Sequence, residues 1–212
     1  MTTTAELIHQ VPYYSQWESP GLVREIIGGQ LSAADDPLWG QSGATTPEEY
    51  EYWSWRLCGV ACLRMALDYW WGLAPPPITL AGECLDAGAY VRKGELLEGL
   101  IHAPFAAYVS GRWGLAARSR PELPAAEIPG HLAAGELVML SVHPAVRMLG
   151  AAEPPRRGGH LVLAVGDAAG DLVIHNPSGF AGESQEFARV PWPDLSRFYA
   201  GRGIVLGPHG SG

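Results

Sequence analysis

The chain has 212 residues, of which 47% are hydrophobic and 17% are charged, and its net charge at pH 7 is -8. This composition is typical of a globular protein and excludes an intrinsically disordered chain. Lys93 is the only lysine and the arginines are scattered, which argues against a nucleic-acid partner and against an anionic membrane surface. A small-molecule or peptide substrate is more natural for such a chain.

Cysteine usage and the chain start bear on the cellular compartment. The three cysteines, Cys58, Cys62 and Cys84, form no Cys-x-x-Cys pair, so neither a disulfide framework nor a structural zinc site is predicted. The first ten residues contain no signal-peptide pattern, and the sequence has no run of about 18 apolar residues. We therefore expect a cytoplasmic protein without a membrane partner. Cys62 and Cys84 are expected to be packing residues.

The N-terminal half is predicted to be rich in helices and loops. Residues 8–16 are predicted to form a short edge strand, because the proline within them is tolerated only where no ladder hydrogen bond is needed. Residues 17–52 are dense in Gly, Pro, Ser, Asp and Thr, which predicts a wall or lid of a cleft with one helix opened by Thr46. Thr79 is predicted to cap a helix that reaches Leu85, and Pro104 is predicted to break a later one.

The site is organised around residues 55–70, which are predicted to place a cysteine at the start of a helix, with helical spacing from Val60 onward. Apolar residues recur at helical spacing while Arg64 and Asp68 fall on another side, as in a half-buried helix. Cys58 lies before or within the first turn. Unpaired N–H groups and the helix dipole favour an anion there, so its thiol is expected to ionise more readily than a free one. Gly59 leaves room for a substrate backbone to pass close to the sulfur.

In the second half of the chain, the pattern of apolar residues changes from helical spacing to that of short strands. The predicted strands are Leu137–Val142, Leu161–Val165, Leu172–His175, Phe187–Val190 and Ile204–Leu206. Helices followed by a meandering sheet indicate an α+β fold with a ligand cleft between two lobes. We predict one domain over residues 1–212, with a helical lobe at about 1–125 and a sheet lobe at about 126–206.

Three polar residues fit the chemistry that a nucleophilic cysteine needs. His160 stands at the start of a predicted strand, after Gly159, and is the best general-base candidate. Asn176 ends the next strand, and a short turn between the two strands places it near His160, where its amide can orient the imidazole. The side-chain NH₂ of Gln16 can stabilise an oxyanion. Taken singly, these residues read as surface or turn positions, so the prediction rests on their order along the chain together with Cys58.

The sequence resembles the papain-like cysteine peptidases, and its local motifs resemble their bacterial leader-processing, double-glycine branch, family thirty-nine. The motifs are Val11-Pro12-Tyr13-Tyr14-Ser15-Gln16, Cys58-Gly59 with Met65 a helix later, Gly159-His160-Leu161-Val162-Leu163 and Asn176-Pro177. The resemblance implies a two-lobed papain-like fold whose nucleophile helix packs on a C-terminal antiparallel sheet. It also implies a thiolate nucleophile at Cys58, a general base and acid at His160, an orienting role for Asn176 and an oxyanion role for Gln16.

Two features depart from this branch. Bacterial relatives commonly carry Asp where this chain has Asn176, so no negative charge stabilises an imidazolium here. The separation of 42 residues between Gln16 and Cys58 (58 minus 16) is longer than in the leader-processing domains.

The expected function is a thiol-dependent hydrolase that cleaves a peptide or amide bond through an acyl-enzyme on Cys58, without a metal or an organic cofactor. Acyl transfer or cyclisation in natural-product assembly remains an alternative, because only the exclusion of water separates them from hydrolysis. A non-catalytic peptide-binding module is a second alternative, and a metal site of Cys58, Cys62 and a histidine is the least favoured. His143 and Arg147 are candidates for binding a substrate carboxylate.

Overall fold

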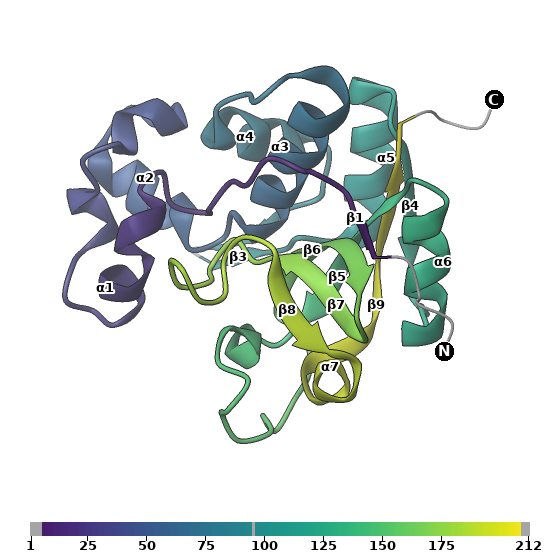
Figure 1. Cartoon of the computed structure of the whole chain (residues 1–212). Helices are drawn as coiled ribbons and strands as arrows, with labels where there is room; N and C mark the ends of the chain where they lie inside the picture. The colour runs from purple at the N-terminus through teal and green to yellow at the C-terminus, as the bar shows by residue number, and fades with distance from the viewer. Residues whose placement is uncertain (1–5, 95, 209–212) are drawn as a thin grey trace, which may run out of the picture.

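The computed structural model describes residues 6–94 and 96–208 (Figure 1). The strands are β1 (Leu7–Ile8), β2 (Val91–Lys93), β3 (Leu96–Glu98), β4 (Ala116–Arg120), β5 (Leu137–Val142), β6 (His160–Ala168), β7 (Asp171–His175), β8 (Ala188–Pro191) and β9 (Tyr199–Gly207). The main sheet is antiparallel with the order β4-β9-β5-β6-β7-β8, and β1 is added beside β6. β2 and β3 form a separate hairpin.

Helices surround this sheet. They are α1 (Val23–Ile27), α2 (Pro47–Ser54), α3 (Cys58–Trp71), α4 (Pro77–Asp86), α5 (His102–Trp113), α6 (Ile128–Ala133) and α7 (Trp192–Phe198), with 3-10 turns at Pro20–Leu22, Ala33–Asp35, Trp39–Ser42, Ala125–Glu127 and Pro144–Arg147. Within the described ranges, no helix has the length and apolar character that crossing a membrane requires. The α+β expectation is confirmed by this mixture of helices and antiparallel sheet.

Two hydrophobic cores sandwich the sheet. β5 is buried along its whole length, and its side chains alternate between the two faces. Leu137 and Met139 belong to the core shared with α3, α4 and α5, whereas Val138 and Leu140 belong to the core shared with α6 and α7. The continuous apolar run that predicted this strand therefore reflects burial on both faces, and the predicted bounds of β5 are confirmed.

Helix α3 is more deeply buried than its sequence pattern predicted. Residues 59–67 are all buried, and Arg64 is only 7% exposed. Arg64 lies under the N-terminal segment and forms an ion pair with Glu18, with 2.9 Å between Nη1 and Oε1. The expectation of a half-buried helix is therefore wrong at Arg64, because a segment distant in sequence covers the face that would otherwise meet solvent.

The segment between β1 and α3 is ordered around a buried carboxylate. Asp36 is fully buried and accepts hydrogen bonds from the Ser19 N–H at 3.1 Å, the Tyr50 hydroxyl at 2.7 Å and the Leu38 N–H at 2.9 Å. The predicted helix at Thr46 is present as α2, and the Thr46 hydroxyl accepts from the Glu49 N–H. This segment, rich in turn residues, is therefore a packed wall with its own polar core.

Several local predictions differ from the structure. The edge strand predicted over residues 8–16 is limited to Leu7–Ile8. Helix α4 begins at Pro77 rather than after Thr79, since a proline suits the first turn of a helix. Pro104 lies in the first turn of α5 and does not break it, for the same reason. Strand β4 and the β2–β3 hairpin had no alternating pattern to predict them.

Candidate active site

Cys58 begins helix α3 and is partly exposed. Its N-cap residue, Leu57, has no side chain that caps the helix, so the N–H groups of the first turn are left without a side-chain partner. Burial nevertheless raises the pKa of the Cys58 thiol, and backbone groups of Leu161 and Gly59 counteract this only in part. The direction is opposite to the easier ionisation expected from a helix terminus, because desolvation disfavours a thiolate more than the backbone groups favour it.

His160 and Asn176 are brought together by the register of two neighbouring strands. His160 is the first residue of β6, Asn176 follows the end of β7, and His160 Nε2 lies 2.8 Å from Asn176 Oδ1. The same Oδ1 accepts from the Ser178 N–H at 3.1 Å. An amide oxygen only accepts, so Nε2 carries the proton in the neutral ring and Nδ1 is left as the basic nitrogen.

The environment of His160 favours the neutral ring. Burial lowers the pKa of His160 to about 4; the hydrogen bond with Asn176 opposes this shift, and the positive charges of Arg147 and His143 add to it. The raised Cys58 pKa and the lowered His160 pKa both favour a neutral thiol beside a neutral imidazole. No hydrogen bond joins Cys58 to His160 in the part of the chain that the structure describes, as is common before substrate binds.

Gln16 and Cys58 line the same cavity. Gln16 is 5% exposed; its side-chain Nε2 donates to the Ser54 carbonyl at 3.1 Å, and its main-chain N–H donates to the Pro177 carbonyl at 2.9 Å. The second contact ties Gln16 to the residue that follows Asn176. The amide has a second N–H besides the one that binds Ser54, and its Oε1 is buried without a hydrogen-bond partner among the described residues.

Two cavities meet at Cys58 and His160. The first, of about 230 Å³, is lined by Gln16, Trp17, Ile27, Trp55, Cys58, Pro144, Arg147, Gly159, His160 and Ser178. The second, of about 190 Å³, is lined by Cys58, Gly99, Leu100, His102, Ser141, Gly159, His160, Leu161 and Arg202. Of the described residues, Cys58, Gly159 and His160 alone belong to both walls. A ligand that contacts Cys58 therefore has room to extend in two directions.

The remaining predicted residues take different places. Gly159 lines both cavities and has φ of +96°, a left-handed conformation that favours glycine. Arg147 lines the first cavity. Gly59 and His143 line neither of them. A Cβ on Gly59 would come within 3.0 Å of the Leu161 side chain, and the ring of His143 accepts from the Ala145 N–H at 3.1 Å.

Other residues of the site had little or no sequence signal. Ser178 Oγ lies 3.0 Å from His160 Nε2 and accepts from Arg147 Nη2 at 2.8 Å. The sequence shows Ser178 two residues after Asn176, but the motif Asn-Pro-Ser-Gly is also typical of an ordinary turn and so did not mark Ser178 as a site residue. Arg202 and His102 reach the second cavity from β9 and α5, and no motif marks either residue.

Cys62 has a packing environment. It is fully buried one turn along α3, and its Sγ lies 3.8 Å from the Leu161 carbonyl oxygen. Across residues 6–94 and 96–208, no three side chains of His, Cys, Asp or Glu are grouped as ligands of one metal ion. The arrangement around Cys58 is thus one of a thiol, an imidazole and two amides.

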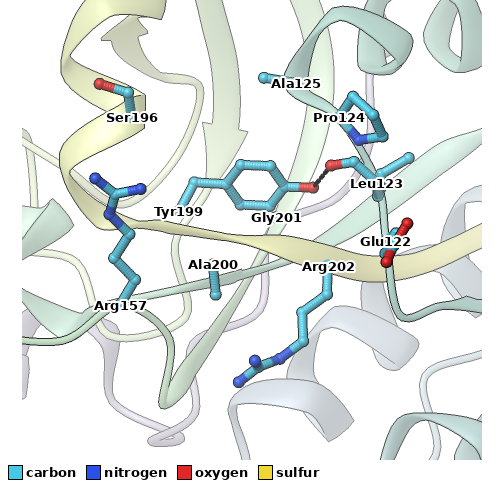
Figure 2. A pocket seen from close by; sticks show the side chains of 10 residues that line it. All are labelled: Glu122, Leu123, Pro124, Ala125, Arg157, Ser196, Tyr199, Ala200, Gly201 and Arg202. Atoms are coloured by element: carbon cyan, nitrogen blue, oxygen red, sulfur yellow. Dashed lines mark hydrogen bonds between the residues drawn. The ribbon is translucent and has the colours of Figure 1, made fainter.

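A further cavity lies apart from this arrangement. Its volume is about 530 Å³, and neither Cys58 nor His160 is in its wall (Figure 2). Its wall includes the Tyr199 hydroxyl, which donates to the Leu123 carbonyl at 2.7 Å. Arg202 is the one residue that this cavity shares with the cavities at Cys58.

No known family profile and no curated protein matches the sequence, but solved structures match the fold. A protein described as a C39-like peptidase from Bacillus anthracis aligns with a TM-score of 0.56 and 16% identity, over 95% of this chain and 97% of its own. The peptidase domain of Streptococcus ComA, a bi-functional ABC transporter involved in a quorum-sensing pathway, aligns with a TM-score of 0.50 and 15% identity, over 73% of this chain and 93% of its own.

This chain has the C39 papain-like peptidase fold. The fold implied by the sequence resemblance is confirmed, including the packing of the helix that begins at Cys58 on an antiparallel sheet. At such identities the likeness concerns the fold, and function has to be argued from the site.

Proposed function

We propose that the protein is a thiol-dependent hydrolase that cleaves a peptide or amide bond through an acyl-enzyme on Cys58. The observation that carries this proposal is the 2.8 Å contact between His160 Nε2 and Asn176 Oδ1. It leaves His160 Nδ1 unprotonated, on a ring that lines the same two cavities as the thiol. A base oriented by a third residue beside a nucleophile is the arrangement that acyl transfer requires.

The proposed reaction starts from the neutral pair. His160 Nδ1 takes the Cys58 proton as the sulfur bonds to the substrate carbonyl carbon, and the carbonyl oxygen becomes an oxyanion. The side-chain amide of Gln16 and the Cys58 N–H donate to that oxygen. His160 returns the proton to the leaving amine as the C–N bond breaks, which leaves a thioester. Water, deprotonated by His160, then hydrolyses the thioester and restores the thiol.

A neutral resting pair is compatible with this reaction. The imidazolium exists only while negative charge is present on the tetrahedral intermediate beside it, so no ion pair has to be maintained in the empty site. Asn176 orients the ring without adding a charge, which is consistent with the low pKa of about 4 at His160.

Substrate contacts are assigned by position. Gly159 exposes main chain to both cavities and is proposed to bind the substrate backbone beside the reacting carbonyl. Arg147 is proposed to contact the substrate directly. Gly59 and His143 are proposed to act indirectly, Gly59 by allowing Leu100 and Leu161 to pack over α3, and His143 by capping the turn that carries Arg147.

The cytoplasmic setting also remains a proposal. All three cysteines are free, which is the state that a reducing compartment maintains.

A digest of a defined synthetic peptide mixture, analysed by mass spectrometry, tests the function. We expect new termini with the wild type and none with Cys58→Ala, while Cys84→Ala, at a buried cysteine outside the site, cleaves like the wild type. Joined or cyclised peptides in place of hydrolysed ones would identify an acyltransferase or a cyclase. Peptide binding by the wild type without any product would contradict the hydrolase and favour a binding module.

A further inference from the structure

Among the residues that the structure describes, the charged side chains that line the two cavities at Cys58 are all basic. Arg147 lies in the wall of the first cavity and Arg202 in the wall of the second, and no described aspartate or glutamate belongs to either wall. The whole chain, in contrast, has 22 acidic and 14 basic residues. An acidic protein thus presents two arginines, and no carboxylate, to whatever occupies the space beside its candidate nucleophile.

Arg147 is poorly satisfied within the protein. One guanidinium nitrogen, Nη2, donates to Ser178 Oγ at 2.8 Å, whereas Nε is buried without a hydrogen-bond partner among the described residues. Glu183 shares another cavity wall with Arg147, but it pairs with Arg24 at 2.6 Å. Arg147 is partly buried, and a guanidinium that loses water contacts without gaining a counter-ion is destabilising, which a bound carboxylate would offset.

Arg202 is exposed and lines both the second cavity and the neighbouring cavity of about 530 Å³. Its Nη2 lies 3.1 Å from the place that a Cβ on Gly158 would take, and its charge contributes, after burial, to lowering the pKa of His102. Figure 2 shows the Arg202 side chain extending away from Glu122, which is the carboxylate of the neighbouring cavity. In the described parts of the chain, neither Arg147 nor Arg202 forms an ion pair.

We propose that the cleft selects a substrate that carries a carboxylate on each side of the group attacked by Cys58, one bound by Arg147 and the other by Arg202. This inference rests on the proposed function and names its substrate class, an acidic peptide or acyl-amide. The carboxylates come either from Asp and Glu side chains or, on one side, from a free C-terminus. Arg147 and Arg202 suit both sources, because a guanidinium binds any carboxylate through paired N–H donors.

Alkylation of Cys58 tests the charge preference without any turnover. Iodoacetate carries a carboxylate where iodoacetamide carries a neutral amide. N-iodoacetylglycine and its amide form a second pair of this kind, in which the carboxylate or amide lies further from the sulfur. The rate of each reagent at Cys58 is measured by peptide mass spectrometry. For each pair of reagents, the rate with the acid is divided by the rate with the amide. This ratio is then divided by the same ratio for the free thiol N-acetylcysteinamide in the same buffer, which removes the intrinsic difference in reactivity between the reagents. For the wild type we expect a normalised ratio of roughly ten at low salt.

Matched variants assign the effect. Arg147→Gln and Arg202→Gln should each lower the normalised ratio several-fold, and Arg147→Lys should retain most of it because the charge stays. Arg157→Gln is the control, since Arg157 lines the cavity next to Arg202 but neither cavity at Cys58. A wild-type ratio of about one with a reactive Cys58, or an equal loss in Arg157→Gln, would overturn the proposal. Failure of every reagent to reach Cys58 would overturn the hydrolase as well.

A peptide series separates the two sources of the carboxylate. One cleaved sequence is made with Asp, Asn or Lys at each flanking position, each as a C-terminal acid and as a C-terminal amide. Faster cleavage of the Asp peptides in both forms indicates side chains, whereas a loss on amidation indicates the terminus. Arg147→Gln should remove the preference on one flank and Arg202→Gln on the other. Equal cleavage of the Asp, Asn and Lys peptides would overturn the proposal while leaving the hydrolase intact.

Discussion

His160 and Asn176 stand on adjacent strands, whereas Gln16 and Cys58 are held by a loop and a helix terminus. The strand pair is joined by a two-residue turn, Ala169 and Gly170, both with positive φ, as a tight hairpin of this kind requires. The loop, in contrast, is held by contacts that span many residues, such as that of Gln16 Nε2 with the Ser54 carbonyl. The geometry of one wall is therefore set locally, and that of the other depends on packing at long range.

This difference predicts different consequences of mutation. The strand pair is built on a sheet whose neighbouring strands are buried on both faces, so a change at His160 should leave the fold intact. The segment around Asp36 has a polar core of its own, so a change there should affect stability first. The following predictions run from the largest expected effect to the smallest.

Replacement of His160 by alanine removes the base from the strand wall. We expect kcat to fall by about 1,000-fold with little change in thermal stability, because the proton of Cys58 then has no acceptor. His131→Ala serves as the control, since His131 pairs with Glu136 at 2.7 Å and lines neither cavity at Cys58. Steady-state kinetics and melting curves of both variants provide the measurement, and a His160→Ala enzyme with normal kcat would rule out the assigned base.

Replacement of Gln16 by alanine tests the other wall. We expect kcat to fall by about 100-fold while KM changes little, since the amide acts on the oxyanion and not on the bound ground state. Gln10→Ala is the matched control, because Gln10 is exposed and precedes the cleft. A fall confined to KM would show that Gln16 binds substrate without stabilising the oxyanion.

Replacement of Asp36 by alanine is expected to destabilise the loop wall. Loss of the buried carboxylate leaves the Ser19 N–H and the Tyr50 hydroxyl without an acceptor, which should cost about 3 kcal/mol in the free energy of unfolding. Urea denaturation measures this cost, with Asp35→Ala as the control because its side chain is exposed. Equal stability of the two variants would show that the polar core of the loop wall contributes nothing.

The pH dependence of kcat/KM tests whether Cys58 and His160 are neutral in the resting enzyme. The base must be unprotonated, so kcat/KM should decline only as the pH falls through about 4, the pKa of His160. Asn176→Asp places a carboxylate beside the ring and favours the imidazolium, so this decline should move to higher pH by about one unit. A wild-type decline near the ordinary histidine value of about 6.5 would contradict the burial assigned to His160.

The same contrast explains how far the sequence was predictive. The apolar run of β5 and the turn after β6 are local features, and they were sufficient to place Asn176 beside His160. The burial of Arg64 was not predictable, because it results from Glu18 in a segment 46 residues away. The place of Arg202 in the site was not predictable from the sequence either. It depends on the register of β9 with β5, and register is a tertiary property.

The central claim is that Cys58 is acylated with help from His160, and acylation by a p-nitrophenyl ester tests it most directly. The protein is quenched in acid at successive times and the acyl group is located by mass spectrometry. The account predicts an acyl group on Cys58 and not on the buried Cys62 or Cys84, formed about 100-fold more slowly in His160→Ala. Acylation of Cys58 at the same rate in His160→Ala, or no acylation of Cys58 in the wild type, would contradict it.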